Sequence, residues 1–198
     1  MHFTTKEIYT TLSDQLPALT EKDIEDFMSI TTYKKVAKNK IILKSGIKTK
    51  KVFLILKGTV RGYITNEKGI EITLIIRSKG IFVADTGRLF TNEPQKMDFK
   101  SIDDAHILLF NYKDFESLAD KNPRIMQLHL NALKEAITRL FYRIESLTMM
   151  PPEERYKDLL ALNPNFLKIT SAKFLANFLG ITPQSLSRIQ KRIKDSRS

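Results

Sequence analysis

The chain contains no cysteine and only three histidines among its 198 residues. The absence of cysteine excludes a disulfide framework, a thiol nucleophile, an iron–sulfur cluster and a cysteine-bound zinc site. The histidines, His2, His106 and His129, lie far apart in the sequence and form no metal-ligand spacing. We therefore expect no metal site, and any sensing of a signal must use other chemistry.

Long apolar runs are absent as well. The longest are VFLIL at 52–56 and ILLF at 107–110, and runs of this length cannot span a bilayer. The first residues mix polar and charged side chains, with no apolar stretch of signal-peptide length. We expect a cytoplasmic protein with no membrane partner.

Positive charge is what the chain has in excess: 33 Lys and Arg against 22 Asp and Glu give a formal charge of +11. This excess favours a nucleic acid or an anionic surface as partner. Residues 168–198 hold seven basic residues and one acid, and residues 34–61 hold ten basic residues and no acid. The second stretch has two alternative interpretations. It contacts bent DNA or an acidic partner, or its lysines lie on strand edges and discourage aggregation.

The first half of the chain predicts a helix followed by many short strands. Thr20 can cap a helix over residues 19–30, with Asp23 at its third position. Residues 36–110 then hold short runs rich in Val, Ile and Phe, separated by turn signals at 45–46, 57–58, 67–69 and 79–80. Closely spaced strands of this kind indicate a sandwich or a small barrel.

A regular apolar stripe follows, at alternating steps of four and three residues, which predicts one long helix. Its members are Met126, Leu130, Leu133, Ile137, Leu140, Ile144 and Leu147. The helix either packs only on its own domain or forms a parallel coiled coil with a second copy, and we favour the dimer. Pro151 and Pro152 end the helix, because neither can donate a backbone hydrogen bond, and they indicate a hinge or domain boundary.

Residues 170–193, TSAKFLANFLGITPQSLSRIQKRI, have the spacing of two helices that cross at a tight turn. Thr170 or Ser171 can cap the first helix. Ala176 stands where only a small side chain fits between the helices, and Gly180 can adopt the left-handed backbone of the turn. The pattern predicts a helix-turn-helix.

The second of these helices begins at Pro183, with Thr182 as its cap, and its outward side chains are of types that read DNA bases or grip phosphates. The candidate DNA-binding residues are Thr182, Gln184, Ser185, Ser187, Arg188, Lys191 and Arg192. An ordinary solvated basic face is the alternative, but the turn spacing favours DNA. Only five residues follow Ile193, and we expect them to be too few for a two-stranded wing.

The whole pattern resembles the Crp/Fnr (cyclic AMP receptor protein) regulators. The resemblance rests on Leu43 with Gly46, the FLILKGTVR block around Gly58, Gly69 with Glu71, and Gly80 before Phe82. It covers nearly the whole chain, and the phrases ERYKDLLALNP and LGITPQSLSRI look most like the Bacteroidetes-type branch.

The resemblance implies an α+β fold in three parts: a helix and a cyclic-nucleotide-binding-like β jelly roll at 1–122, a dimerisation helix at 123–150, and a helix-turn-helix domain without a full wing at 151–198. The implied partners are double-stranded DNA and a second copy of the chain, with RNA polymerase as a further candidate.

The ligand-binding motifs of the family are altered in this chain. Members that bind cyclic nucleotide use a Gly-Glu-Leu/Ile turn and an Arg followed by Ser/Thr and Ala, whereas this chain has FVADT at 82–86 and PQKMD at 94–98. Asp85, Thr86 and Lys96 are the candidate ligand pocket. Lysine lacks the planar fork of arginine, and Ala84 restricts a turn that glycine would allow. These departures argue against a cyclic nucleotide, and no cofactor is assigned.

We therefore expect a homodimeric DNA-binding transcription regulator that is not controlled by cyclic AMP. The alternative is a small-molecule sensor that acts through protein contacts and carries a vestigial DNA-binding domain. An enzyme is not expected, because the sequence offers no His-rich ligand set for metal catalysis. The adjacent Glu153 and Glu154 stand at a helix start, where the helix dipole favours acids, and they indicate no catalytic site.

Overall fold

A computed structural model describes residues 5–162 and 170–195. The chain divides into two compact units. Unit 1 comprises Met1–Gly62 and Ile76–Ile137, and unit 2 comprises Tyr63–Ile75 and Thr138–Ser198. In the described part of the chain, no helix is both long enough and apolar enough to cross a membrane.

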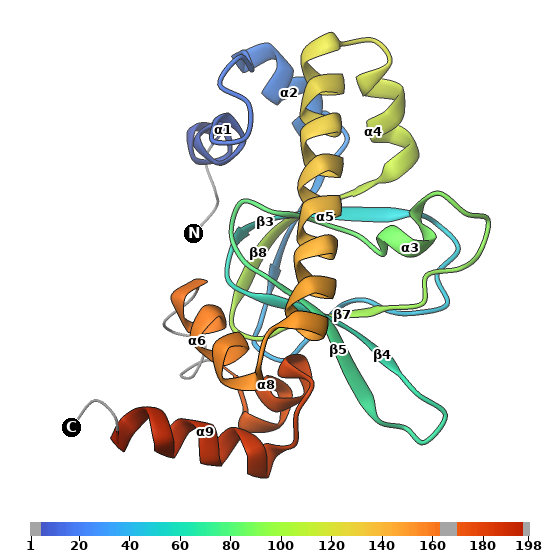
Figure 1. The fold of residues 1–198 in the computed structure, drawn as a ribbon. Helices are drawn as coiled ribbons and strands as arrows, with labels where there is room; N and C mark the ends of the chain where they lie inside the picture. Colours follow the sequence, from blue (N-terminus) through green and yellow to red (C-terminus); the bar gives the residue numbers. More distant parts are fainter. Residues whose placement is uncertain (1–4, 163–169, 196–198) are drawn as a thin grey trace. The chain divides into compact units, whose positions relative to one another are not determined.

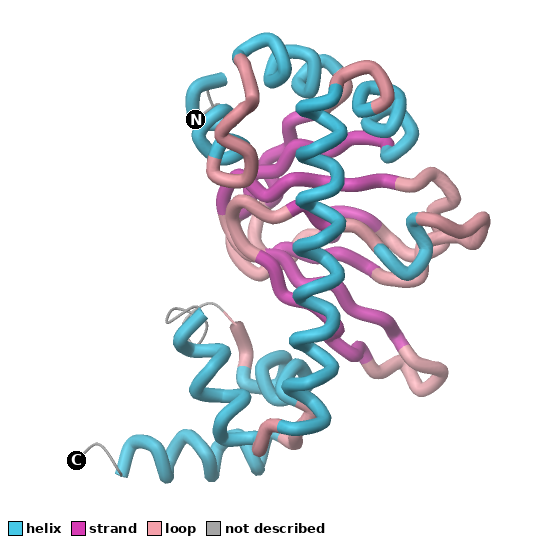
Figure 2. Tube along the Cα trace, turned by 45° about the horizontal axis from the view of Figure 1, so that its top comes forward, coloured by secondary structure: helices cyan, strands magenta, loops and turns pink. Residues whose placement is uncertain are grey.

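The elements up to residue 119 are α1 (Thr5–Ser13), α2 (Glu21–Ser29), β1 (Thr32–Val36), β2 (Ile41–Leu43), β3 (Lys51–Lys57), β4 (Val60–Thr65), β5 (Glu71–Arg77), β6 (Phe82–Val83), α3 (Thr86–Leu89), β7 (Asp98–Ser101), β8 (Ala105–Asn111) and α4 (Tyr112–Ala119). They are followed by α5 (Pro123–Met149), α6 (Pro152–Leu162), α8 (Ala172–Leu179) and α9 (Pro183–Asp195). Figures 1 and 2 show α5 as one continuous helix.

The strands form two four-stranded sheets, in the orders β1-β8-β3-β6 and β2-β7-β4-β5. Strands β3 and β8 pair antiparallel at the centre of the first sheet, with Phe53 opposite Leu109. Alternate residues of β3 face opposite sides of this sheet. Phe53 contacts Phe99 of β7 in the other sheet, with ring centroids 5.6 Å apart, whereas Leu54 belongs to the cluster that packs under the helices. This arrangement confirms the predicted jelly roll.

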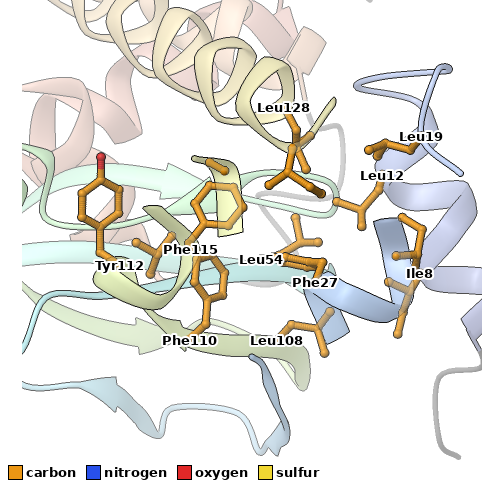
Figure 3. Packing of buried hydrophobic residues seen from close by; sticks show 14 of the residues in the cluster. Ile8, Leu12, Leu19, Phe27, Leu54, Leu108, Phe110, Tyr112, Phe115 and Leu128 are labelled. Carbon is orange, nitrogen blue, oxygen red and sulfur yellow. The ribbon is translucent and has the colours of Figure 1, made fainter. Parts of the chain in front are cut away.

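The main hydrophobic core of unit 1 lies between the first sheet and the helices. Phe27 of α2 is fully buried and meets Phe110 and Phe115 edge-on, with ring centroids 5.3 and 5.9 Å apart. Leu128 of α5 and Leu54 of β3 are also fully buried in this cluster (Figure 3). The core therefore joins one face of α5 to the jelly roll.

Local signals place the helix ends as the sequence predicted. Thr20 caps α2, and its hydroxyl and the carboxylate of Asp23 bond each other's backbone N–H groups in a capping box. Helix α5 ends at Met149 and α6 begins at Pro152, so the proline pair separates two helices. Asp23 also binds Arg124 at the start of α5, with 2.6 Å between Oδ2 and Nε.

Candidate nucleic-acid interface

Helices α8 and α9 form the predicted helix-turn-helix within unit 2. The Ser171 hydroxyl accepts a hydrogen bond from the N–H of Phe174 and caps α8. Gly180 follows α8 with a left-handed backbone, at φ 69°, where a side chain would be strained. Ala176 is fully buried. The capping, turn and close-packing roles predicted for these residues are therefore all present.

Helix α9 has one buried face and one exposed face. Leu186, Ile189 and Ile193 are buried. The Thr182 hydroxyl caps the helix by accepting a hydrogen bond from the N–H of Ser185 at 3.1 Å. Of the candidate DNA-binding residues, Ser185 is half-buried and the other six are exposed. The apolar pattern thus turns the polar and basic side chains toward solvent.

The basic side chains on the exposed face of α9 have almost no ion-pair partners among the described residues. Arg192 lies 3.4 Å from Glu153, and its side chain is 67% exposed, so this ion pair contributes little to stability. Within the described residues, Arg188 and Lys191 have no ion pair. A polyanion can reach these cations without first breaking an internal salt bridge.

The first helix of the motif carries contacts that the sequence pattern did not predict. The Asn177 side-chain oxygen accepts a hydrogen bond from the Thr73 N–H at 2.6 Å, which attaches α8 to β5 inside unit 2. Arg143 and Arg155 donate to the carbonyl groups of Phe178 and Leu179 at the end of α8. No sequence motif indicates the roles of Asn177, Arg143 and Arg155, because each of these side chains bonds a backbone group, and every residue has a backbone.

Helix α5 presents two apolar faces. Ile125 and Leu128 are fully buried in the core of unit 1, and Met126 packs against that core. Five residues of the predicted dimer stripe are instead exposed over 42–59% of their surface: Leu130, Ile137, Leu140, Ile144 and Leu147. Leu133, the remaining member, is half-buried. A row of large exposed apolar side chains on one helix is typical of a surface that another chain covers.

The predicted ligand pocket is not assembled as a pair of opposite charges. Asp85 is 8% exposed, and its carboxylate accepts hydrogen bonds from the backbone N–H groups of Lys96 and Met97, at 2.7 and 3.0 Å. The Lys96 side chain is exposed and has no ion pair among the described residues. Thr86 begins the short helix α3 and is half-buried. The carboxylate therefore holds two segments of backbone together.

The two histidines in the described part of the chain bond to tyrosine side chains. His106 contacts the Tyr33 hydroxyl, and burial, followed by the charges of Lys35 and Lys57, lowers its pKa. His129 bonds the Tyr112 hydroxyl at 2.9 Å. His2 lies outside the described residues. Within the described part, no group of three His, Asp or Glu side chains could hold a metal ion.

The chain is similar to known proteins in one of its domains and over most of its length. Residues 33–122 match the model of the cyclic nucleotide-binding domain. The "cAMP-activated global transcriptional regulator CRP" of Pasteurella multocida is 22% identical over 189 residues, covering 87% of each chain. The Salmonella typhimurium protein of the same name is 21% identical over 187 residues, covering 89% of each chain.

Residues 33–122 belong to the cyclic nucleotide-binding domain family, and the chain is similar to CRP and Crp/Fnr regulators over most of its length.

Several solved structures share the fold of this protein. The c-di-GMP responsive global regulator CLP of Xanthomonas campestris has a TM-score of 0.70 at 14% identity, covering 89% of this chain and 93% of that one. FixK2 of Bradyrhizobium japonicum has a TM-score of 0.69 at 16% identity, covering 84% and 86%. A regulator of the crp/fnr family from Eubacterium rectale has a TM-score of 0.68 at 15% identity, covering 92% and 88%.

The domain match contains Asp85 and Lys96 but ends before α5 begins. The cyclic nucleotide-binding domain and the similarity to Crp/Fnr regulators are confirmed, whereas the roles of the DNA-binding, pocket and dimer residues stay predictions, as does the narrower Bacteroidetes-type branch. The expectation about a wing concerns the five residues after Ile193, of which 196–198 lie outside the described residues. The role of the basic stretch at 34–61 also stays open. Its Lys34, Lys35, Lys38 and Lys57 are exposed.

Proposed function

We propose that this chain is a homodimeric transcription regulator that binds double-stranded DNA through α9 and is not controlled by cyclic AMP. The division that we propose is a jelly-roll body at 1–122, a dimerisation helix at 123–150 and a DNA-binding domain at 151–198, with RNA polymerase as a further partner. Such a regulator works in the cytoplasm, where the DNA is. One observation carries the proposal. Helix α8 is capped by Ser171 at its start and by Gly180 at its end, and the following helix α9 exposes a polar and basic face.

Chemistry supports a role for α9 in reading DNA. The guanidinium of Arg188 can fork onto the two acceptors of guanine, and the amide of Gln184 can pair with adenine. Lys191 and Arg192 supply charge for phosphates, which positions a protein without reading sequence. Homologous regulators support the same role, since the CRP proteins that this chain resembles are transcriptional regulators.

The exposed stripe of α5 supports the homodimer. Ile137 and Ile144 are 55% and 59% exposed, and residues at this spacing pack as knobs into holes against an identical parallel helix. Two recognition helices joined in this way can enter successive major grooves about 34 Å apart. A palindromic DNA site follows from the two-fold symmetry of the dimer.

The pocket residues support independence from cyclic AMP. Asp85 is 8% exposed, and its Oδ2 already accepts from two backbone N–H groups, which favours a structural role over contact with a ribose. Lys96 offers a single exposed ammonium where family members that bind the nucleotide use the planar guanidinium of arginine.

Selection of DNA fragments by the full-length protein at low salt tests the proposal. We expect a palindromic sequence to be enriched, with an affinity that falls steeply as salt is added. Arg188→Ala should reduce the preference between the best site and a one-base variant by about 1–3 kcal/mol. Lys191→Ala should weaken binding to all sequences and lower the salt dependence by about one ion.

Lys121→Ala is the matched control, because Lys121 is an exposed cation in unit 1, outside the helix-turn-helix, and it should leave binding unchanged. If the wild-type dimer binds no fragment above background at low salt, DNA regulation is the wrong function. A tightly bound small molecule in that same protein would then favour the alternative of a sensor that acts through protein contacts.

A further inference from the structure

The last turn of α8 leaves two carbonyl groups that the helix itself cannot satisfy. A helix has four carbonyl groups without intrahelical partners at its C-terminal end. The Gly180 N–H bonds the Asn177 carbonyl at 3.1 Å, and the Ile181 N–H bonds the Ala176 carbonyl at 3.0 Å. The carbonyl groups of Phe178 and Leu179 remain.

Two arginines from other helices supply the missing donors. Arg143 of α5 donates to the Phe178 carbonyl, and its guanidinium carbon lies 4.1 Å from the centroid of the Phe178 ring. Arg155 of α6 donates through Nε to the Leu179 carbonyl at 3.0 Å. Both cations therefore sit at the negative end of the α8 dipole, where positive charge is stabilised.

Arg155 also ties this end of α8 to the end of α5. Its Nη1 donates to the Met150 carbonyl at 2.7 Å and to the Ser146 carbonyl at 3.4 Å. The turn after α8 is close to α5 as well, because a Cβ atom on Gly180 would lie 3.3 Å from Cδ2 of Leu147. All of these residues belong to unit 2. One guanidinium thus joins α5, α6 and α8.

Burying two arginine side chains without carboxylate partners in the described part of the chain costs free energy, so stability alone does not explain them. Arg155 is only 9% exposed, and neither arginine has a carboxylate partner among the described residues. Burial, together with the charge of Arg155, lowers the pKa of Arg143 to about 10. Apolar side chains of similar volume often replace buried charges without loss of stability. What arginine adds is a rigid planar set of donors that fixes direction as well as distance.

We propose that Arg143 and Arg155 are positioning residues that hold the helix-turn-helix at one orientation on the end of α5. In a dimer joined through α5, that orientation sets the separation of the two recognition helices and therefore the preferred spacing of the DNA half-sites. This inference rests on the proposed function, since it concerns how the DNA-binding helices are placed.

The test compares binding of the full-length protein to palindromes that differ only in the number of base pairs between half-sites. The half-site sequence is the one selected by the wild-type protein. We expect the wild type to prefer one spacing by about tenfold or more. In Arg155→Met and Arg143→Met, the difference in affinity between palindromes of different spacing should shrink, while the affinity for a single half-site changes little. Arg155→Lys should behave like Arg155→Met, because one ammonium cannot reach the carbonyls of both helices.

Leu159→Ala is the control for lost stability, since Leu159 is buried on α6 and bonds neither arginine. At a similar loss in melting temperature it should keep the wild-type preference for one spacing. An Arg155→Met protein that keeps this preference, or a Leu159→Ala protein that loses it, would overturn the inference. A wild-type protein that binds no palindrome would contradict the proposed function and the positioning role with it. Failure of the positioning role alone would appear only in the variants, so the two failures can be distinguished.

Discussion

The carboxylate of Asp85 lies 2.7 Å from the backbone nitrogen of Lys96, while the ammonium of Lys96 remains exposed. The two residues that sequence comparison places in a ligand pocket therefore meet through the backbone of one of them. The contact joins the residue before α3 to the segment before β7, with Met97 contributing a second N–H. Its consequence is that Asp85 supports the fold at the predicted ligand pocket.

The first prediction concerns Asp85. Asp85→Ala leaves two backbone N–H groups without their acceptor, so the free energy of unfolding should fall by about 2 kcal/mol. Asp85→Asn keeps an acceptor and should lose less. Urea denaturation followed by circular dichroism measures both variants. In thermal unfolding followed by circular dichroism, millimolar cyclic AMP should leave the melting temperature of the wild type unchanged, because a ligand stabilises only a folded state that binds it. A rise of several degrees would contradict this account of the pocket.

The second prediction is a pH dependence that comes from Asp23. The hydrogen bond from Arg124, with further ones from Thr20 and Asn122, holds the pKa of this buried carboxyl well below its usual value of 3.8. A carboxyl with a depressed pKa in the folded state contributes stability that is complete above its unfolded pKa and is lost as the pH falls through the folded pKa.

Asp23→Asn should therefore be less stable than the wild type by about 2 kcal/mol at pH 7, and the difference should shrink as the pH falls below about 4. Asp26→Asn is the control. Asp26 pairs with Lys22 on an exposed helix surface, and its loss should cost no more than about 0.5 kcal/mol. A difference between Asp23→Asn and wild type that is independent of pH would show that the charge of Asp23 is not responsible.

The third prediction separates the two faces of α5. Leu128→Ala removes a fully buried side chain from the core and should lower the free energy of unfolding by about 3 kcal/mol. Ile137→Glu alters a side chain that is 55% exposed, so it should disrupt association and leave the fold of the monomer intact. Sedimentation at micromolar concentration should show Ile137→Glu as a monomer. Lys134→Glu, at an exposed polar position of the same helix, should remain a dimer. Equal sedimentation of Ile137→Glu and wild type would contradict the proposed dimer.

The fourth prediction compares two glycines with similar backbones. Gly46 and Gly58 have φ values of 86° and 90°, so alanine is strained at both positions. A Cβ atom on Gly46 would meet nothing within 4 Å, whereas on Gly58 it would lie 2.5 Å from the Asp104 carbonyl oxygen. We expect Gly58→Ala to lower the free energy of unfolding by at least about 2 kcal/mol more than Gly46→Ala. Equal losses, measured by thermal unfolding, would mean that the chain around Asp104 can move aside.

The sequence alone determined the elements and their order, because the signals for these are local. Thr20 and Asp23 cap a helix by bonding residues within one turn, and the glycine at 180 ends another through its own backbone freedom. The apolar spacing in residues 126–147 and in α9 predicted which side chains lie together on one side of each helix. The long helix, the proline break and the helix-turn-helix could be predicted on these grounds, whereas the strand spacing indicated only a sandwich or small barrel and the jelly roll followed from the family resemblance.

Only the tertiary structure decided the partners of polar side chains that bond distant segments of the chain. The carboxylate of Asp85 binds the backbone N–H groups of Lys96 and Met97, and Arg155 binds the carbonyl of Leu179. Backbone N–H and carbonyl groups are almost the same at every residue, so a side chain that will bind one leaves no motif at the partner position. Such contacts exist only once segments far apart in the chain have been brought together, and for that reason the positioning role of the arginines could be inferred only from the folded protein.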